Sequence, residues 1–142
     1  MLRDNVRREA FCLALDRLVT PSSVVLEMGG GTGFFACYAA KLGAGQVHCV
    51  DFNPAIEVGR KTALANGLTV NFSQGRTQDL ELAQKADIIL HDMRGMLPIF
   101  QFNLDALQDA RLRLAAPQAR FIPSEDQVFC CLVQDEPFYD RS

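Results

Sequence analysis

Three glycines near the beginning of the chain have the spacing of a loop that binds a ligand through its backbone. Gly29, Gly31 and Gly33 follow the apolar run Val24–Met28, and a helical pattern begins at Phe34. Because glycine has no Cβ, the backbone at these positions lets a ligand approach closely. A loop between a first strand and a first helix is where open parallel sheets bind nucleotide-like ligands. The spacing therefore predicts a binding site for such a ligand here.

The residues that flank the glycines narrow the class of ligand. A dinucleotide-binding GxGxxG loop needs glycine or alanine three positions after Gly31, and this chain has Phe34 there. A dinucleotide-dependent oxidoreductase is therefore the weakest alternative. Glu27, just before the loop, is expected to face a cationic, amine-bearing ligand, since a carboxylate would repel a pyrophosphate.

A second carboxylate ends the next apolar run, Gln46–Asp51. Asp51 stands at the interval at which α/β sheets place an acid against the hydroxyls of a ribose. The alternative is an acid that caps the helix beginning at Asn53 and Pro54. Given the glycine loop, ribose binding is the favoured interpretation.

Periodic patterns predict the elements that hold these residues. Apolar residues at helical spacing predict helices over residues 3–19, 34–42, 54–66 and 102–116. Short apolar runs predict strands at Val24–Met28, Gln46–Asp51, 68–73, Ala86–His91 and 119–122. Apolar strands that alternate with helices indicate one α/β, Rossmann-like domain over residues 1–142, with a mostly parallel sheet covered by helices on both faces.

A last apolar run, ValPheCysCysLeuVal at residues 128–133, predicts a sixth strand with only nine residues after it. An uncovered strand of this composition is an aggregation hazard. Two arrangements stay open at this point. Either the 142 residues are a fragment whose continuation packs on the strand, or the strand pairs within the domain's own sheet.

Composition excludes several classes of protein. The 142 residues are 49% hydrophobic and carry a formal charge of -3, which suits one packed domain and disfavours nucleic acid as a partner. No run approaches the roughly 20 apolar residues that a membrane helix needs, so a cytoplasmic protein is expected. The cysteines lack CxxC spacing and lie among apolar neighbours, which favours buried thiols over a metal site or disulfides: Cys12, Cys37, Cys49, Cys130 and Cys131.

Longer motifs carry a resemblance to a known family. They are MLRDNVR at the start, VLEMGGGTG at the glycine loop, AAKLGA and NGL before the second and third strands, DIIL, and ARLRLAAP near the end. The glycine loop resembles motif I of class I S-adenosylmethionine-dependent methyltransferases. Over nearly its whole length, the chain resembles the catalytic core of protein arginine methyltransferases.

The resemblance implies that the ligand is the cofactor S-adenosyl-L-methionine. It implies that Arg7 pairs with the methionyl carboxylate and that Met1 covers the adenosine or sulfonium region, so that the opening helix acts as a lid. Gln78 matches the position at which the family binds the adenine amino group, and an amide oxygen can accept that hydrogen bond. Phe52, beside Asp51, joins the implied cofactor site. Without the resemblance, Arg7 would be interpreted as a solvated helix charge.

The acceptor site is where the chain departs from the family. Arginine methyltransferases use two glutamates after the fourth strand, and the matching residues here are Asp92 and Gln101. The resemblance implies that both are catalytic, with Asp92 orienting the acceptor and one ion pair lost at Gln101. His91 is interpreted as a buried strand-end residue bonded to backbone in preference to a base, and Arg94 as a loop residue.

The sequence thus predicts a methyltransferase that acts on a nitrogen or oxygen nucleophile of a protein or small molecule, with no metal. The alternative is a catalytically inactive, cofactor-binding relative that docks a partner. The family's Thr-His-Trp loop and C-terminal β-barrel have no match in this chain, so the domain is expected to be truncated before a C-terminal β domain. A homodimer is compatible with the resemblance.

Overall fold

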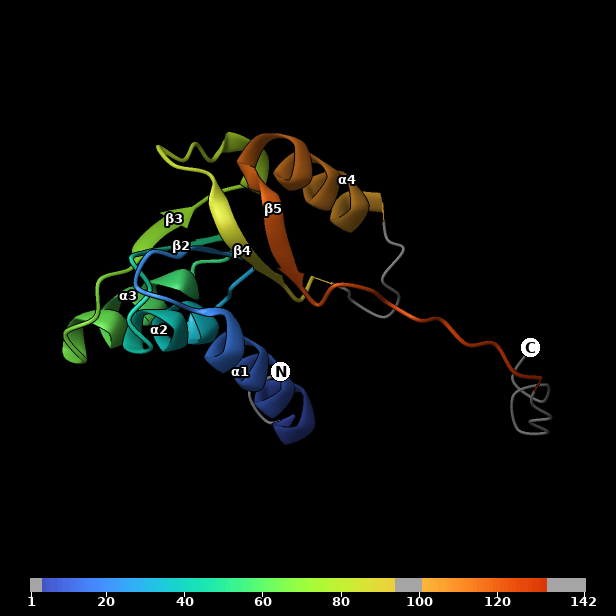
Figure 1. Cartoon of the computed structure of the whole chain (residues 1–142), viewed down its shortest axis with the longest axis horizontal. Helices are drawn as coiled ribbons and strands as arrows, with labels where there is room; N and C mark the ends of the chain where they lie inside the picture. The colour runs from blue at the N-terminus through green and yellow to red at the C-terminus, as the bar shows by residue number, and fades with distance from the viewer. Residues whose placement is uncertain (1–3, 94–100, 133–142) are drawn as a thin grey trace.

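Five parallel strands form one sheet in the order β3-β2-β1-β4-β5 (Figure 1). The computed structural model describes residues 4–93 and 101–132. The strands are β1 (Val24–Met28), β2 (Gln46–Asp51), β3 (Asn71–Gln74), β4 (Ala86–His91) and β5 (Ala115–Ile122). The order reverses direction between β1 and β4, and such a switch point leaves a crevice at the carboxyl ends of the two strands.

Helices cover both faces of this sheet, as the sequence predicts (Figure 1). They are α1 (Asn5–Leu18), α2 (Phe34–Lys41), α3 (Ile56–Ala65) and α4 (Gln101–Asp109), with a 3-10 turn η1 (Thr77–Asp79) and a π-helical segment η2 (Ala110–Leu114). In β1, Val25 packs with α1, α2 and α3, whereas Leu26 packs with α4 and η2. All five residues of β1 are buried, because successive side chains point to opposite covered faces.

The predicted bounds of β1, β2 and β4 are confirmed, while other elements begin or end elsewhere. The third helix begins at Ile56 and not at Pro54, because Pro54 and Ala55 form a turn in which the Asn53 side-chain oxygen accepts a hydrogen bond from the Ala55 amide at 2.8 Å. The last helix gives way to η2 at Ala110, and β5 begins earlier than predicted, at Ala115.

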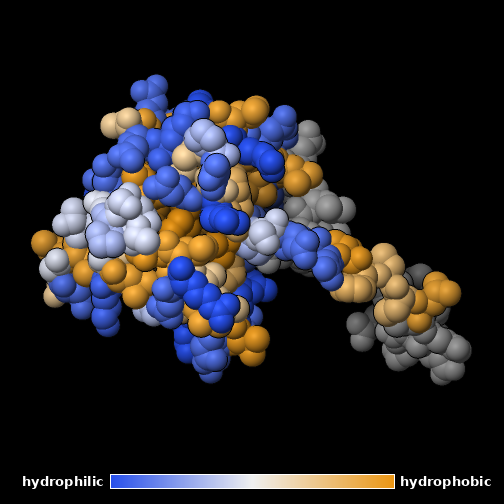
Figure 2. Space-filling view, viewed as in Figure 1, coloured by the Kyte–Doolittle hydropathy of each residue, from blue (hydrophilic) through white to orange (hydrophobic). Residues whose placement is uncertain are grey.

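The predicted sixth strand is wrong for residues 128–132, the part of it that the structure describes. These residues pair with no strand among the described residues and lead away from the sheet (Figure 1). Phe129 is 86% exposed and Leu132 is fully exposed, and Figure 2 shows the apolar residues of this extension. An apolar sequence makes a strand only where a neighbouring strand supplies hydrogen-bond partners, and none adjoins this segment in the described part of the chain.

The described residues contain no helix that is both long and apolar enough to span a bilayer.

A glycine inside α3 brings that helix against the glycine loop. Alanine ordinarily stabilises a helix relative to glycine by up to about 1 kcal/mol. At Gly59, however, a Cβ would lie 2.6 Å from the carbonyl oxygen of Thr32 and 2.8 Å from the Phe72 ring. Thr32 belongs to the loop, so the helix cannot accept a methyl group here without moving the loop.

We therefore expect Gly59→Ala to lower the free energy of unfolding by about 1–3 kcal/mol in urea denaturation. Val58→Ala, at an exposed neighbouring position of the same helix, is the control and is expected to change it by less than about 0.5 kcal/mol. A Gly59→Ala variant more stable than the parent would contradict the close packing of α3 on the loop.

Candidate functional site

The glycine loop lies at the carboxyl end of β1, at the switch point of the sheet. Gly29, Gly31 and Gly33 have φ values of 63°, 55° and 65°, in the left-handed region that favours glycine. A Cβ at Gly29 would lie 2.5 Å from Cγ of Met93, so this glycine also permits close packing. A Cβ at Gly31 would meet no atom of the described residues within 4 Å. Gly31 is therefore where the backbone of the loop faces open space.

The Asp51 carboxylate ties this loop to the end of β2. Its Oδ2 accepts a hydrogen bond from the Gly31 amide at 2.6 Å, and its Oδ1 accepts one from the Asn53 amide at 2.7 Å. The residue is buried, yet it adjoins the open side of the loop at Gly31. Each carboxylate oxygen has a second lone pair, so Asp51 can hold the loop and still accept a hydrogen bond from a ligand hydroxyl.

The structure corrects the expected orientation of Glu27. Its carboxylate is buried behind Gly30 and accepts a hydrogen bond from the Ala36 amide, in the first turn of α2, at 2.8 Å. Residues 25 and 27 share one face of β1, the face that α2 covers, so Glu27 points toward the positive end of that helix and not toward the open side of the loop. The alternation of side chains along β1 indicates this orientation of Glu27, whereas the charge of Glu27 considered alone does not.

Burial makes Glu27 a weaker acid than a glutamate in water. Removal from water raises its pKa from 4.5 to about 7, although hydrogen bonds from α2 and from the Cys49 thiol oppose the shift. Cys49 lies directly opposite Glu27 in the register of β1 and β2. Burial, followed by the charge of Glu27, raises the pKa of that thiol, so Cys49 is a neutral partner and not a reactive thiolate.

An ion pair joins the opening helix to the end of β4. Arg7 Nη1 lies 3.2 Å from Oδ2 and 3.3 Å from Oδ1 of Asp92, whose side chain is only 7% exposed. Asp4, the N-cap of α1, accepts a hydrogen bond from the Arg7 amide and lies 3.5 Å from its Nε. Arg7 is therefore not an isolated, solvated charge. It contacts Asp92, although the resemblance assigns Arg7 to the cofactor and Asp92 to the methyl acceptor.

The remaining candidates lie around the same edge of the sheet. Phe52 is 77% exposed directly after Asp51. The Gly75 amide donates to the Asp51 carbonyl oxygen at 3.0 Å, so the segment that leads to η1 and Gln78 starts beside Asp51. The Gln78 side chain is exposed.

Some predicted residues cannot be placed. Met1 and Arg94 lie outside the described residues, and Gln101 is described only as the first residue of α4. His91 is buried, with Nε2 3.2 Å from the Pro123 carbonyl oxygen, which confirms the interpretation as a strand-end residue bonded to backbone.

Two residues that support the site could not be predicted from the sequence. Met93 packs under Gly29, and Arg113 of η2 binds the backbone of η1. Both depend on contacts between distant segments, which local patterns do not report. Among the described residues, no group of three or more histidines, cysteines or acids is placed to hold a metal ion.

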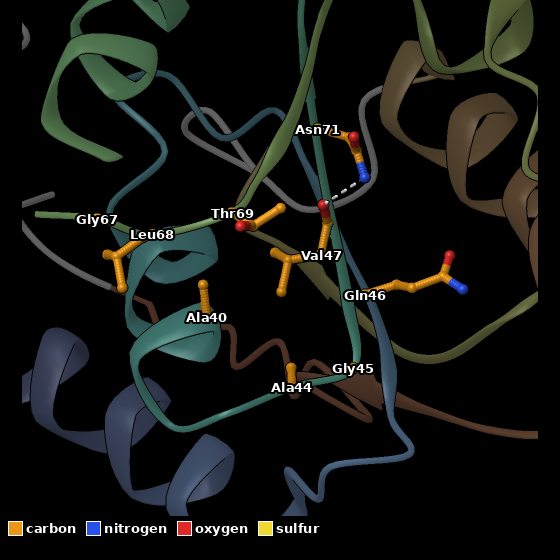
Figure 3. A pocket seen from close by; sticks show the side chains of 9 residues that line it. All are labelled: Ala40, Ala44, Gly45, Gln46, Val47, Gly67, Leu68, Thr69 and Asn71. Carbon is orange, nitrogen blue, oxygen red and sulfur yellow. Dashed lines mark hydrogen bonds between the residues drawn. The ribbon is translucent and has the colours of Figure 1, made fainter. Parts of the chain in front are cut away.

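A cavity of about 500 Å³ lies at the opposite end of the sheet (Figure 3). It is lined by residues of α2, of the start of β2 and of the α3–β3 connection, including Ala40, Val47 and Leu68. None of the described residues that line it is charged, and the Asn71 side-chain amide donates to the Val47 carbonyl oxygen at 3.3 Å. Because ligands of open α/β sheets bind at the carboxyl ends of the strands, the glycine loop and not this cavity is the candidate site.

The buried carboxyl of Glu27 predicts a specific dependence of stability on pH. Between about pH 4.5 and 7 the folded protein keeps a proton on Glu27 that the unfolded chain has released. The Glu27 contribution to the free energy of unfolding therefore decreases as the pH rises through this range, by about 3 kcal/mol in all, and is constant above it.

Glu27→Gln should remove this contribution, so that the variant gains stability relative to the parent between about pH 5 and pH 8 in urea denaturation. The control is Glu81→Gln, at an exposed position, which should leave the pH profile unchanged. Parallel profiles for Glu27→Gln and the parent would overturn the assignment of a raised pKa to the carboxyl beneath the loop.

Comparison with known proteins agrees with this geometry. Residues 25–117 match the model of a methyltransferase domain. The chain is 32% identical over 133 residues to ribosomal protein arginine N-methyltransferase rmt3 of Schizosaccharomyces pombe, covering 90% of this chain and 24% of that protein. It is 28% identical over 146 residues to protein arginine N-methyltransferase 1 of Dictyostelium discoideum, covering 99% of this chain and 43% of that protein. The chain thus spans less than half the length of these relatives.

Solved structures give the same result. A Trypanosoma brucei PRMT1 enzyme-prozyme heterotetrameric complex with AdoHcy superposes with a TM-score of 0.78 at 29% identity, over 85% of this chain and 39% of that one. Arabidopsis thaliana protein arginine methyltransferase 10 superposes with a TM-score of 0.78 at 28% identity, over 86% of this chain and 36% of that one. The chain therefore belongs to the methyltransferase-domain family and, within it, resembles the core of the protein arginine methyltransferases.

Proposed function

We propose that this chain is the S-adenosyl-L-methionine-binding domain of an arginine methyltransferase-like enzyme that transfers a methyl group to a nitrogen nucleophile. The observation that carries the proposal is the Asp51 carboxylate bonded to the amide of Gly31, the loop glycine at which a Cβ would meet none of the described residues. This pair offers a carboxylate for ribose hydroxyls beside backbone that a ligand can approach closely. When bound, the cofactor supplies an electrophilic methyl group on a sulfonium.

The remaining cofactor contacts follow from positions around Asp51. Gly29, Gly31 and Gly33 present backbone to the amino acid end and the ribose. The exposed ring of Phe52 flanks the base, and the Gln78 amide oxygen accepts a hydrogen bond from the adenine amino group. In this proposal Glu27 holds the loop from behind through α2 and does not contact the cofactor.

Arg7 and Asp92 supply a positive and a negative charge at the end of β4. Arg7 uses Nη1 on Asp92 and Nε on Asp4, and its Nη2 bonds to none of the described residues, which leaves donors for a methionyl carboxylate. Asp92 accepts hydrogen bonds from the acceptor nitrogen and orients it for an in-line displacement. Since Arg7 lies over Asp92, α1 also limits access of water to this carboxylate.

Gln101, as the second catalytic position, offers an amide in place of a carboxylate. An amide oxygen accepts one hydrogen bond but adds no charge, so a guanidinium acceptor would form one ion pair fewer than it does between two glutamates. The names of the relatives favour a protein acceptor for this chain. A small-molecule acceptor, an oxygen nucleophile, a homodimer, a cytoplasmic location and a following β domain stay predictions.

A partner-docking role without catalysis is the second candidate. The exposed apolar side chains of Phe129 and Leu132, together with the loss of a carboxylate at Gln101, favour it. Incorporation of radiolabelled methyl into any peptide by the full-length protein would contradict this candidate.

Cofactor binding is tested by isothermal titration of the full-length protein with S-adenosylhomocysteine. Asp51→Ala should weaken binding by at least about tenfold, because it removes the ribose contact and releases the Gly31 amide. Asp51→Asn keeps one acceptor oxygen but removes the charge. It therefore separates the effect of the charge from the effect of releasing the loop. Asp105→Ala, an exposed acid of α4, is the control. Unchanged affinity in Asp51→Ala, or no binding by the parent, would refute the cofactor assignment.

The role of Asp92 is tested by methyl transfer to an arginine-containing peptide. Asp92→Asn should lower kcat by about a hundredfold, while the affinity for cofactor changes by less than about fivefold. Gln101→Glu restores the second carboxylate and should raise the rate on this peptide. An Asp92→Asn variant with normal kcat would show that this carboxylate does not position the acceptor.

A further inference from the structure

Arg113 is tied to the last turn of α4 by its neighbour Asp109. Its Nε donates to Oδ1 at 3.0 Å and its Nη2 to Oδ2 at 2.8 Å, a two-point carboxylate contact within one helical turn. The residue lies in η2, the π-helical segment that follows α4. Such segments change the direction of side chains relative to a regular helix and occur often at functional sites. The guanidinium is thereby held in one orientation.

Nη1 and Nη2 of Arg113 also donate to the backbone of one short turn, and the two hydrogens of Nη2 are shared between the Asp109 carboxylate and two carbonyl oxygens. Nη2 donates to the carbonyl oxygens of Thr77 at 2.9 Å and Gln78 at 3.1 Å, and Nη1 donates to that of Leu80. The side chains at both ends of this segment, Thr77 and Leu80, are buried, whereas the Gln78 side chain between them is exposed. One guanidinium thus fixes the backbone on both sides of an exposed amide.

We propose that Arg113 is a positioning residue for recognition of adenine, because it holds the turn that presents Gln78 to the base. The inference rests on the proposed function, in which Gln78 accepts a hydrogen bond from the adenine amino group. A three-residue 3-10 turn at the surface has little structure of its own. Each residue that had to be ordered during binding would lower affinity by roughly tenfold, and a turn already held by Arg113 avoids this loss.

The chemistry of arginine suits this task better than that of lysine. A planar guanidinium has five donors, which here reach one carboxylate and three carbonyl oxygens together. A lysine at 113 would have three donors on a single nitrogen and could not span the same set. Arg111, which is exposed in the same segment, has none of these contacts and serves as a matched control.

The test measures selectivity for the adenine amino group. Dissociation constants of the full-length protein are determined for S-adenosylhomocysteine and for its analogue with hydrogen in place of the 6-amino group. Arg113→Ala should weaken binding of the adenine ligand by about tenfold and that of the deamino analogue by less than about twofold. Gln78→Ala should lose the same selectivity, and adding Arg113→Ala to it should cause no further loss. Arg111→Ala should retain the selectivity of the parent.

Equal weakening of both ligands by Arg113→Ala would mean that Arg113 only stabilises the fold, and would overturn the inference. Unchanged selectivity would overturn it as well. If Arg113→Ala does not fold, Asp109→Asn loosens the guanidinium without removing it, and should lower selectivity in the same direction. A parent protein that binds neither ligand would refute the proposed function itself, which separates the two failures.

Discussion

The hydrogen bonds of the Asp51 carboxylate hold together the two loops on which the site depends. One loop has three glycines in the left-handed region and little side-chain packing of its own at Gly31. The other turns from β2 into α3 through Asn53. A carboxylate that accepts a hydrogen bond from an amide of each loop fixes their separation at the carboxyl edge of the sheet, beside the switch point between β1 and β4. In the proposed function, the two oxygens that hold these loops together also bind the ribose.

A second carboxylate, that of Glu27, supports the loop from its buried side, although burial of this group is unfavourable. Glu27 gives an acceptor to the first turn of α2, but its burial makes the charged form unfavourable. The Cys49 thiol beside it is a weak donor and carries no charge, so it offers Glu27 a hydrogen bond but no ion pair. Close packing continues outward to Gly59 of α3, whose backbone lies against the carbonyl of Thr32. The loop is thus supported by β2, α2 and α3 together.

Two arginines connect elements that the sheet does not join directly. Arg7 links α1 to the end of β4, and Arg113 links η2 to η1. In the proposed function, each lies beside a part of the site that contacts the cofactor or the acceptor. Guanidinium groups suit such places because they bind several oxygens at once and stay charged at any physiological pH.

The sequence by itself determined the alternation of strands and helices, the bounds of β1, β2 and β4, and the glycine loop with Asp51, because these depend on residues close together in the chain. Only the tertiary structure decided that Arg7 meets Asp92 across 85 positions and that Arg113 holds the backbone of η1. It also decided that residues 128–132 form no strand, since a strand needs a neighbour as well as an apolar sequence. Contacts of this kind depend on which segments the folded sheet brings side by side, and local patterns do not encode that.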